Sequence, residues 1–203
     1  NGGIVLKWLR DMHDNEYEQQ AKILGYTNTY DLFNEYVSKI KPGSDGLIFL
    51  PYLTGQRSPH WKADARGIIS GIQLNHGKEH LMRAAMEGVM YNMFSIYEAI
   101  MQLNSNAREI IANGGYANSD IWLQIQADIF NKAISVAGIK EAAAFGAAFV
   151  AMAGIGAIDS LTEKNMLPAM KPNMTIEPIK ANVDIYQRGY VEFKKVYDVV
   201  YGS

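Results

Sequence analysis

The longest regular pattern in the sequence is helical and runs from Lys78 to Leu103. Along it, apolar residues recur three or four positions apart, which is the spacing that places side chains on one face of a helix. They are Leu81, Ala85, Met86, Val89, Met93, Ile96 and Ile100. We therefore expect one long amphipathic helix here, and the fold class depends on the elements that surround it.

Short apolar runs of strand length stand on both sides of this helix, at 47–50, 67–72, 109–112 and 134–136. Further helical patterns occupy 3–13, the stretch up to Leu24, 32–40, 118–131, 141–153 and 183–200. Strands that alternate with helices predict an α/β layer structure. The first 45 residues look wholly helical, so either the sheet is small for the chain or some of its strands lie upstream. Residues 166–178 are expected to form a surface connection.

Composition and charge limit the classes of protein to which the chain can belong. Its 203 residues suit one sizeable domain, and 48% of them are hydrophobic, which is an ordinary globular value. The formal net charge of −2 offers no electrostatic case for binding nucleic acid or an anionic membrane. No apolar run approaches the roughly 20 residues of a membrane helix. The absence of cysteine excludes disulfides and fits a reducing cytoplasm, where we expect the protein to reside.

The chain opens on Asn1-Gly2-Gly3 and enters a helical pattern at once, without an initiator methionine or a signal peptide. We therefore read it as a fragment of a larger protein.

A glycine-rich turn between a strand and a helix is the clearest candidate for a ligand site. Ile110-Ile111-Ala112 leads into Asn113-Gly114-Gly115, and a helix follows from about Asn118. Glycine lets a backbone approach a ligand closely, and the free N–H groups at a helix N-terminus attract phosphate. A tight strand-to-helix turn without any ligand would look the same, so spacing alone leaves both interpretations open.

Two other patterns favour plainer interpretations. Gly146 stands inside a helical pattern, where glycine costs about 1 kcal/mol relative to alanine, and close helix packing is the favoured reason over a ligand. His76 to His80 spells the H-x-x-E-H of one class of zinc peptidase, but Gly77 lies inside it and no third ligand accompanies the pair. We therefore predict no metal ligand in this chain.

The polar loop from Thr54 to Trp61 combines charged, aromatic and turn residues. Trp61 beside Arg57 could serve a ligand, or it could attach a long loop to the protein surface. Without a visible partner for these residues, we favour attachment by Trp61.

Several segments together resemble the FGGY carbohydrate kinases. Residues 67–87 match the second signature of that family throughout, and the loops 52–61 and 64–67 have the form of the loops that flank it. Residues 113–129 look like the family's nucleotide loop and the helix after it, and 141–148 look like a further family helix. The resemblance covers essentially all the chain. Segments 1–11, 42–47 and 78–92 are most similar to gluconate kinases, and xylulose kinases match them less well.

The resemblance implies the ribonuclease-H-like α/β fold shared by sugar kinases, actin and heat-shock ATPases. Two such domains close on a cleft, with the sugar held mainly by the first and ATP mainly by the second. Residues 1–203 correspond to the second, C-terminal domain. The implied reaction transfers the γ-phosphoryl group of ATP, with Mg²⁺, to a sugar or sugar acid, converting gluconate to 6-phosphogluconate in the gluconate case. The implied partners are ATP, the sugar and the N-terminal domain, and a homodimer is left open.

The resemblance also implies a set of nucleotide-binding residues. Gly3 and Lys7 match positions that line the nucleotide pocket in glycerol kinases, where Lys7 is replaced by glutamine. Gly115 and Ser119 match positions near the adenosine and phosphates, and Gly114 lies beside them.

No catalytic residue is assigned, because the family's catalytic base is an aspartate of the first domain, upstream of Asn1. The aspartates that do not match its position are Asp45, Asp64, Asp120 and Asp128. Xylulose kinase or another FGGY sugar kinase is the alternative within the family. A non-catalytic, actin-like nucleotide-binding module is the alternative from another class.

Overall fold

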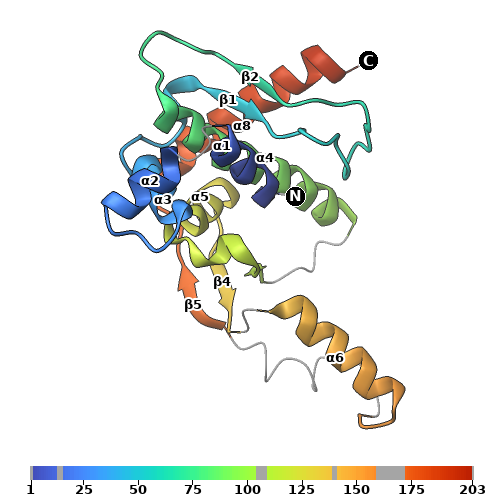
Figure 1. The fold of residues 1–203 in the computed structure, drawn as a ribbon. Coiled ribbons are helices and arrows are strands. Elements are labelled where there is room, and N and C mark those ends of the chain that lie inside the picture. The colour runs from blue at the N-terminus through green and yellow to red at the C-terminus, as the bar shows by residue number, and fades with distance from the viewer. Residues whose placement is uncertain (1, 13–15, 104–108, 139–140, 159–171, 203) are drawn as a thin grey trace.

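The computed structural model describes residues 2–12, 16–103, 109–138, 141–158 and 172–202. It is rich in helices and has two small sheets (Figure 1). The helices are α1 (Gly2–Asp11), α2 (Glu16–Ile23), α3 (Thr29–Ser38), α4 (Lys78–Leu103), α5 (Asp120–Phe130), α6 (Ala142–Gly154) and α8 (Lys180–Tyr201). The strands are β1 (Ile48–Leu50), β2 (Ile68–Ser70), β3 (Ile111–Ala112), β4 (Ile134–Ala137) and β5 (Pro172–Ile176), and two short 3₁₀ turns are η1 (Ser44–Gly46) and η2 (Gly115–Asn118).

Helix α4 has the bounds that the apolar periodicity predicts, and it lies at the centre of the molecule. It contacts α1, α3, α5, α8 and β1. Residues 82–91 in its first half are all buried. A side chain at Gly88 would place its Cβ 2.0 Å from the carbonyl oxygen of Phe49, so α4 can approach β1 this closely only because glycine occupies that position.

The two sheets differ in their strand directions. β1 and β2 are antiparallel, with Phe49 opposite Ile69. In the second sheet, β4 lies between β3, which is parallel to it, and β5, which is antiparallel to it. Strand β5 falls within 166–178, so the prediction of a surface connection is wrong for 172–176. The side chains of 172–175 are exposed, and β5 is held by backbone pairing to the buried β4; no alternation of apolar and polar residues therefore marks it.

Aromatic side chains from distant segments meet in the main core. Tyr17 of α2 and Phe33 of α3 pack edge to face at 5.2 Å between ring centroids. The ring of Tyr91 on α4 packs at a tilt against the rings of Tyr190 and Phe193 of α8, at 5.9 and 5.4 Å between centroids. A smaller cluster of apolar residues lies between the second sheet and α5. The two clusters hold α4, α5 and the β3–α5 connection in fixed relative positions.

The loop before β2 is attached to α8, but by different residues from the one expected. Trp61 is 73% exposed, so the prediction that it fastens the loop is wrong. His60 stacks on Tyr197 at 4.8 Å between ring centroids, and the backbone N–H of Arg66 donates to the hydroxyl of Tyr201. His60 and Arg66 therefore attach the loop to α8, where Trp61 was expected to do so.

Helix α6 stands apart from the rest of the molecule, as Figure 1 shows. None of its residues is buried. No atom lies within 4 Å of the position that a Cβ on Gly146 would take, so the close packing expected at this glycine is not found among the described residues. Within the described part of the chain, no helix combines the length and apolar character needed to cross a membrane.

Candidate functional site

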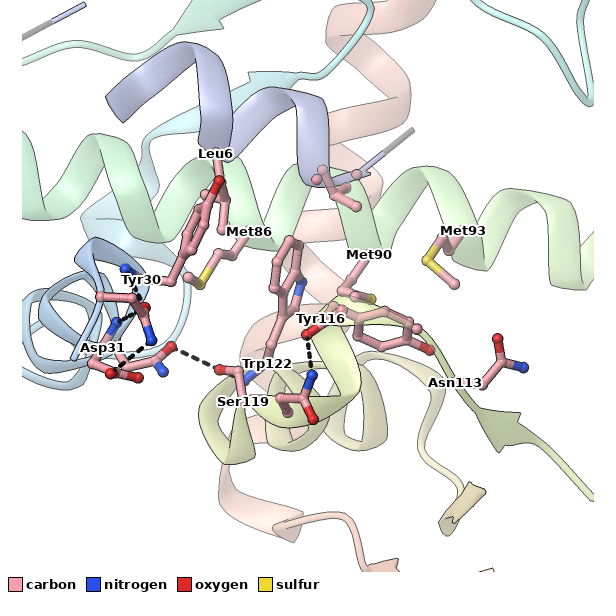
Figure 2. Close-up of a pocket in the computed structure, with 18 residues that line it drawn as sticks. Leu6, Tyr30, Asp31, Met86, Met90, Met93, Asn113, Tyr116, Ser119 and Trp122 are labelled. Carbon is pink, nitrogen blue, oxygen red and sulfur yellow. Dashed lines mark hydrogen bonds between the residues drawn. The ribbon is translucent and has the colours of Figure 1, made fainter. Parts of the chain in front are cut away.

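A cavity of about 660 Å³ lies between the start of α1, the start of α3, the middle of α4 and the β3–α5 connection (Figure 2). One wall is apolar and consists of Met86, Val89, Met90 and Met93 of α4. The opposite wall comes from the glycine-rich turn and the start of α5. The volume lies within the range of about 300–1,000 Å³ in which proteins bind small molecules.

The glycine-rich turn presents bare backbone to this cavity. Gly114 has φ +88° and ψ −173°, a conformation open to glycine and costly for other residues. Gly115 follows as the first residue of η2. An added Cβ at Gly3, Gly114 or Gly115 would meet no atom within 4 Å. The space beside these three residues is therefore free for a ligand to approach the main chain.

Ser119 joins the glycine-rich turn to α3. It is the N-cap of α5, and its hydroxyl oxygen accepts a hydrogen bond from the backbone N–H of Trp122 at 3.3 Å. The same hydroxyl donates to Asn34 Oδ1 at 2.7 Å. Because both contacts use the hydroxyl, Ser119 sets the position of the turn relative to α3 as well as lining the cavity.

The α3 side of the cavity was not anticipated from the sequence. Asn28 caps α3 by accepting hydrogen bonds from the backbone N–H groups of Tyr30 and Asp31, at 2.8 and 3.1 Å. The carboxylate of Asp31 in turn accepts from Thr27 Oγ1 and Asn28 Nδ2, both at 2.9 Å. An asparagine before a helical pattern is a readable cap, but nothing in the sequence links that cap to a turn more than 80 residues away.

Trp122 is the second feature that sequence reasoning missed. Its side chain lines the cavity and is 4% exposed, yet its Nε1 has no hydrogen-bond partner among the described residues. The indole packs against the ring of Tyr116 at 5.8 Å between centroids, and Figure 2 shows both rings facing the methionines of α4. An indole N–H can only donate, and leaving it buried without a partner costs about 1–3 kcal/mol. A ligand atom that accepts a hydrogen bond would remove this cost.

The structure brings together most of the residues that the resemblance named. Gly3, Gly114, Gly115 and Ser119 all line the cavity. Lys7 is not among the described lining residues; it is exposed and forms an ion pair with Asp11 at 2.7 Å. The role of all five in binding a nucleotide remains a prediction.

The cavity offers little for a divalent cation. The described residues contain no group of three or more His, Cys, Asp or Glu side chains that could hold a metal ion. Asp31 supplies the one carboxylate among the described lining residues, and its Oδ2 already accepts two hydrogen bonds. We therefore assign no magnesium ligand to this part of the protein.

Comparison with known proteins identifies the relatives of this chain. The profile of the C-terminal domain of the FGGY family of carbohydrate kinases matches residues 1–155. The chain belongs to the FGGY family. The gluconokinase of Bacillus licheniformis is 40% identical over 161 residues, which cover 79% of this chain and 31% of that protein. The xylulose kinase of Staphylococcus epidermidis is 35% identical over 196 residues, covering 96% and 37%.

Solved structures of FGGY kinases have the same fold. The gluconate kinase of Lactobacillus acidophilus superimposes with a TM-score of 0.76 at 27% identity, covering 98% of this chain and 38% of that one. The ligand-bound xylulose kinase of the same organism gives 0.79 at 26%, covering 99% and 38%. The expected ribonuclease-H-like fold is confirmed. The chain spans about a third of the length of these relatives.

The FGGY signature at 67–87 lies mainly outside the cavity, since Met86 alone among these residues lines it. Its last residue, Glu87, is 2% exposed and accepts hydrogen bonds from Arg83 Nε, from the backbone N–H of Gly43 and from Ser44 Oγ, at 2.8, 2.9 and 2.8 Å. Arg83 also donates to the hydroxyl of Tyr186 on α8 at 2.7 Å. We refer to these five residues as the Arg83–Glu87 cluster.

The Arg83–Glu87 cluster also holds the end of α3, because Arg83 Nη1 donates to the carbonyl oxygens of Val37 and Ile40. Burial raises the pKa of Glu87, and the charge of Arg83 opposes this rise. Burial likewise raises the pKa of the Tyr186 hydroxyl. Arg83 and Glu87 of the family signature therefore hold in place the elements that surround the cavity.

Proposed function

We propose that this chain is the nucleotide-binding C-terminal domain of a two-domain carbohydrate kinase, in which it binds ATP for phosphoryl transfer to gluconate. The observation that carries the proposal is the lining of the cavity. It exposes main chain without side chains at Gly3, Gly114 and Gly115, and it includes the buried indole N–H of Trp122, which has no hydrogen-bond partner among the described residues. A nucleotide has the complementary groups, namely anionic phosphates and a flat, partly apolar base with hydrogen-bond acceptors.

The two walls of the cavity suit different parts of ATP. The methionines of α4 are flexible, polarisable side chains that pack well against an aromatic ring, so this wall suits the base. The N–H groups at the start of α1 and in the glycine-rich turn suit the phosphates, because both expose backbone donors at the positive end of a helix or turn. Trp122 Nε1 would donate to an acceptor atom of the nucleotide.

The reaction follows from general phosphoryl-transfer chemistry. An acceptor hydroxyl oxygen bonds to the γ-phosphorus while the bond from that phosphorus to the β–γ bridging oxygen breaks, so ADP leaves. The proton of the hydroxyl passes to a base, which we place on an aspartate of the first domain. Mg²⁺ would neutralise phosphate charge, and we assign none of the described residues as its ligand. Positioning and electrostatic stabilisation supply most of such catalysis.

Gluconate is preferred over xylulose as the substrate on the strength of the sequence comparison. The gluconokinase of B. licheniformis is 40% identical to this chain, against 35% for the xylulose kinase of S. epidermidis. Xylulose is the second candidate, because the structural likeness is equally strong to kinases of both names.

The proposal is tested on the complete polypeptide that contains this chain, with ATP and Mg²⁺ and a panel of gluconate, xylulose and glycerol. We expect phosphorylation of gluconate with the highest kcat/KM. The 203-residue chain alone should bind ATP in a calorimetric titration but transfer no phosphate, because the base is absent from it. Binding without transfer by the complete polypeptide would instead favour the actin-like, non-catalytic module, and gluconate phosphorylation by the chain alone would contradict our placement of the base.

A further inference from the structure

The two ends of the cavity differ in the groups that line them. Figure 2 shows Tyr30, Asp31 and Met86 at the end next to α3, and Asn113, which begins the glycine-rich turn, at the other end. The carboxylate of Asp31 repels phosphates, whereas an aromatic ring and a thioether offer apolar surface to a flat ring. The α3 end therefore suits the base of a nucleotide, and the end at the glycine-rich turn suits its phosphates.

Asn34 of α3 lines the cavity, and a single hydrogen bond sets the orientation of its side-chain amide. Its Oδ1 accepts from the hydroxyl of Ser119 at 2.7 Å. The oxygen of that hydroxyl already accepts from the backbone N–H of Trp122 at 3.3 Å, so its one proton is directed to Asn34. Asn34 Nδ2 therefore keeps two N–H donors without a partner among the described residues. The amide offers donors, and no free acceptor, to a ligand.

Adenine and guanine differ at the positions that such an amide can distinguish. The N1 atom of adenine is an unprotonated ring nitrogen and accepts a hydrogen bond. Guanine carries a proton on N1 and an amino group on the neighbouring carbon, and both of these groups donate. A donor placed against this edge pairs with adenine, but it meets donors on guanine and leaves them without the hydrogen bonds that they make in water. The orientation of the Asn34 amide therefore favours adenine.

We infer that Asn34 contacts the base of the nucleotide and that Ser119 positions its amide, so that the site selects adenine over guanine. This inference deepens the proposed function and rests on it. Ser119 acts through Asn34, because protein groups already occupy both contacts of its hydroxyl. Asn34 is thus the specificity-determining residue, and Ser119 is a positioning residue. The two lie 85 positions apart in the chain, so no local pattern in the sequence connects them.

The first experiment measures the binding of ATP and of GTP, each with Mg²⁺, to the complete polypeptide by calorimetric titration. The wild type should bind ATP about 100-fold more tightly than GTP. Asn34→Asp keeps an oxygen for Ser119 and replaces the two N–H donors with an acceptor, which suits guanine. ATP affinity should fall about tenfold and GTP affinity should rise about tenfold, the effect of one hydrogen bond lost or gained.

Two further variants separate base recognition from the added charge. Asn118→Asp places the same charge elsewhere in the lining of this cavity and is the matched control. It should weaken ATP and GTP by the same factor, because a negative charge repels the phosphates of both. Asn34→Ala removes the amide without adding charge, and it should lower the ratio of ATP to GTP affinity about tenfold.

The second experiment tests the positioning role of Ser119 with the same titrations. Ser119→Ala leaves the Asn34 amide free to turn its oxygen toward the base, so the ratio of ATP to GTP affinity should fall about tenfold. Ser119→Thr keeps a hydroxyl and should keep the ratio. Ser119→Ala also removes the cap of α5 and lowers stability, which thermal unfolding measures, but lost stability alone leaves the ratio unchanged. An unchanged ratio in Ser119→Ala would overturn the positioning role.

The outcomes separate this inference from the proposed function. A wild-type polypeptide that binds neither nucleotide refutes the proposed function itself. Equal binding of ATP and GTP by the wild type refutes only the selection of adenine. A wild type that prefers ATP, with the same ratio in Asn34→Asp and Asn34→Ala, refutes the role of Asn34. A parallel loss of both affinities in Asn34→Asp, equal to that in Asn118→Asp, would also refute it, since charge alone would then explain the loss.

Discussion

The Arg83–Glu87 cluster and the cavity are both built on α4, and their polar groups are in opposite states. In the cluster, the carboxylate of Glu87 accepts three hydrogen bonds and the guanidinium of Arg83 reaches four different residues. At the cavity, Trp122 Nε1 is buried without a partner and the glycines border open space. Polar groups that satisfy one another stabilise the fold, and those left unsatisfied mark where a ligand is expected.

The comparison also separates the residues that identify the family from the residues that we expect to bind the nucleotide. The signature residues Arg83 and Glu87 tie α4 to the end of α3, to the turn at Gly43 and to α8. The cavity is lined by short stretches from four parts of the chain, and most of these have no distinctive sequence. Four predictions test this division, in order of decreasing effect.

Arg83→Met should cause the largest change, a loss of about 3–5 kcal/mol in the free energy of unfolding. It leaves the carboxyl group of Glu87 buried with one donor fewer, and it removes the donors to Val37 and Ile40. Urea denaturation followed by circular dichroism measures the loss. Lys195→Met breaks an exposed pair with Glu192 and serves as the control, with little effect expected. Equal losses in the two variants would mean that the Arg83–Glu87 cluster contributes no more than a surface ion pair.

Gly115→Val should weaken ATP binding about 100-fold, or about 2.7 kcal/mol, without lowering stability. A Cβ at this position would meet no atom of a neighbouring residue within 4 Å, and the valine side chain would enter space that we assign to the nucleotide. Gly146→Val on α6 is the matched control, because its surroundings are equally open and it lies outside the cavity lining. Calorimetric titration with ATP compares the two variants. Unchanged affinity in Gly115→Val would remove the glycine-rich turn from the nucleotide site.

Trp122→Phe should weaken ATP binding about fivefold, or about 1 kcal/mol, which is the typical value of one hydrogen bond. Because the variant deletes a buried donor that has no partner, its stability without ligand should fall less than burial of a large ring alone would predict. Thermal unfolding with and without ATP separates the two effects. A variant that loses stability but keeps full ATP affinity would show that the indole N–H serves the fold.

Lys7→Gln should have the smallest effect, a change of less than about threefold in ATP affinity, since breaking an exposed ion pair costs little. Lys7 pairs with Asp11 and is not among the described residues that line the cavity, although the resemblance places it in the nucleotide pocket. The same ATP titration decides the matter. A loss of tenfold or more would mean that Lys7 leaves Asp11 and reaches the nucleotide when it binds.

Local patterns in the sequence predicted most of the helices and strands. The bounds of α4 follow from its apolar periodicity, and the end of α2 follows from Gly25, which has φ +77°. Strand β5 escaped because its side chains are exposed and its pairing with β4 is a backbone interaction that no residue pattern reports. Trp61 was misjudged for a related reason, since the partner of an aromatic residue depends on α8, which lies far away along the chain.

The residues of the candidate site were likewise predicted from the sequence only in part. Gly114 and Gly115 could be predicted because the chain itself needs glycine between a strand and a helix there. Asn34 and Trp122 could not, since whether a polar atom finds a partner is settled only when distant segments pack.

The sequence by itself therefore determined the family, the order of the main elements and the glycine-rich turn, because these depend on local conformational preferences and on a long contiguous signature. The tertiary structure alone decided that α1, α3, α4 and α5 enclose a cavity, and which buried polar atoms remain without partners among the described residues. The physical reason is that hydrogen-bond satisfaction and enclosed volume are properties of packed surfaces from separate segments, and local sequence does not encode them.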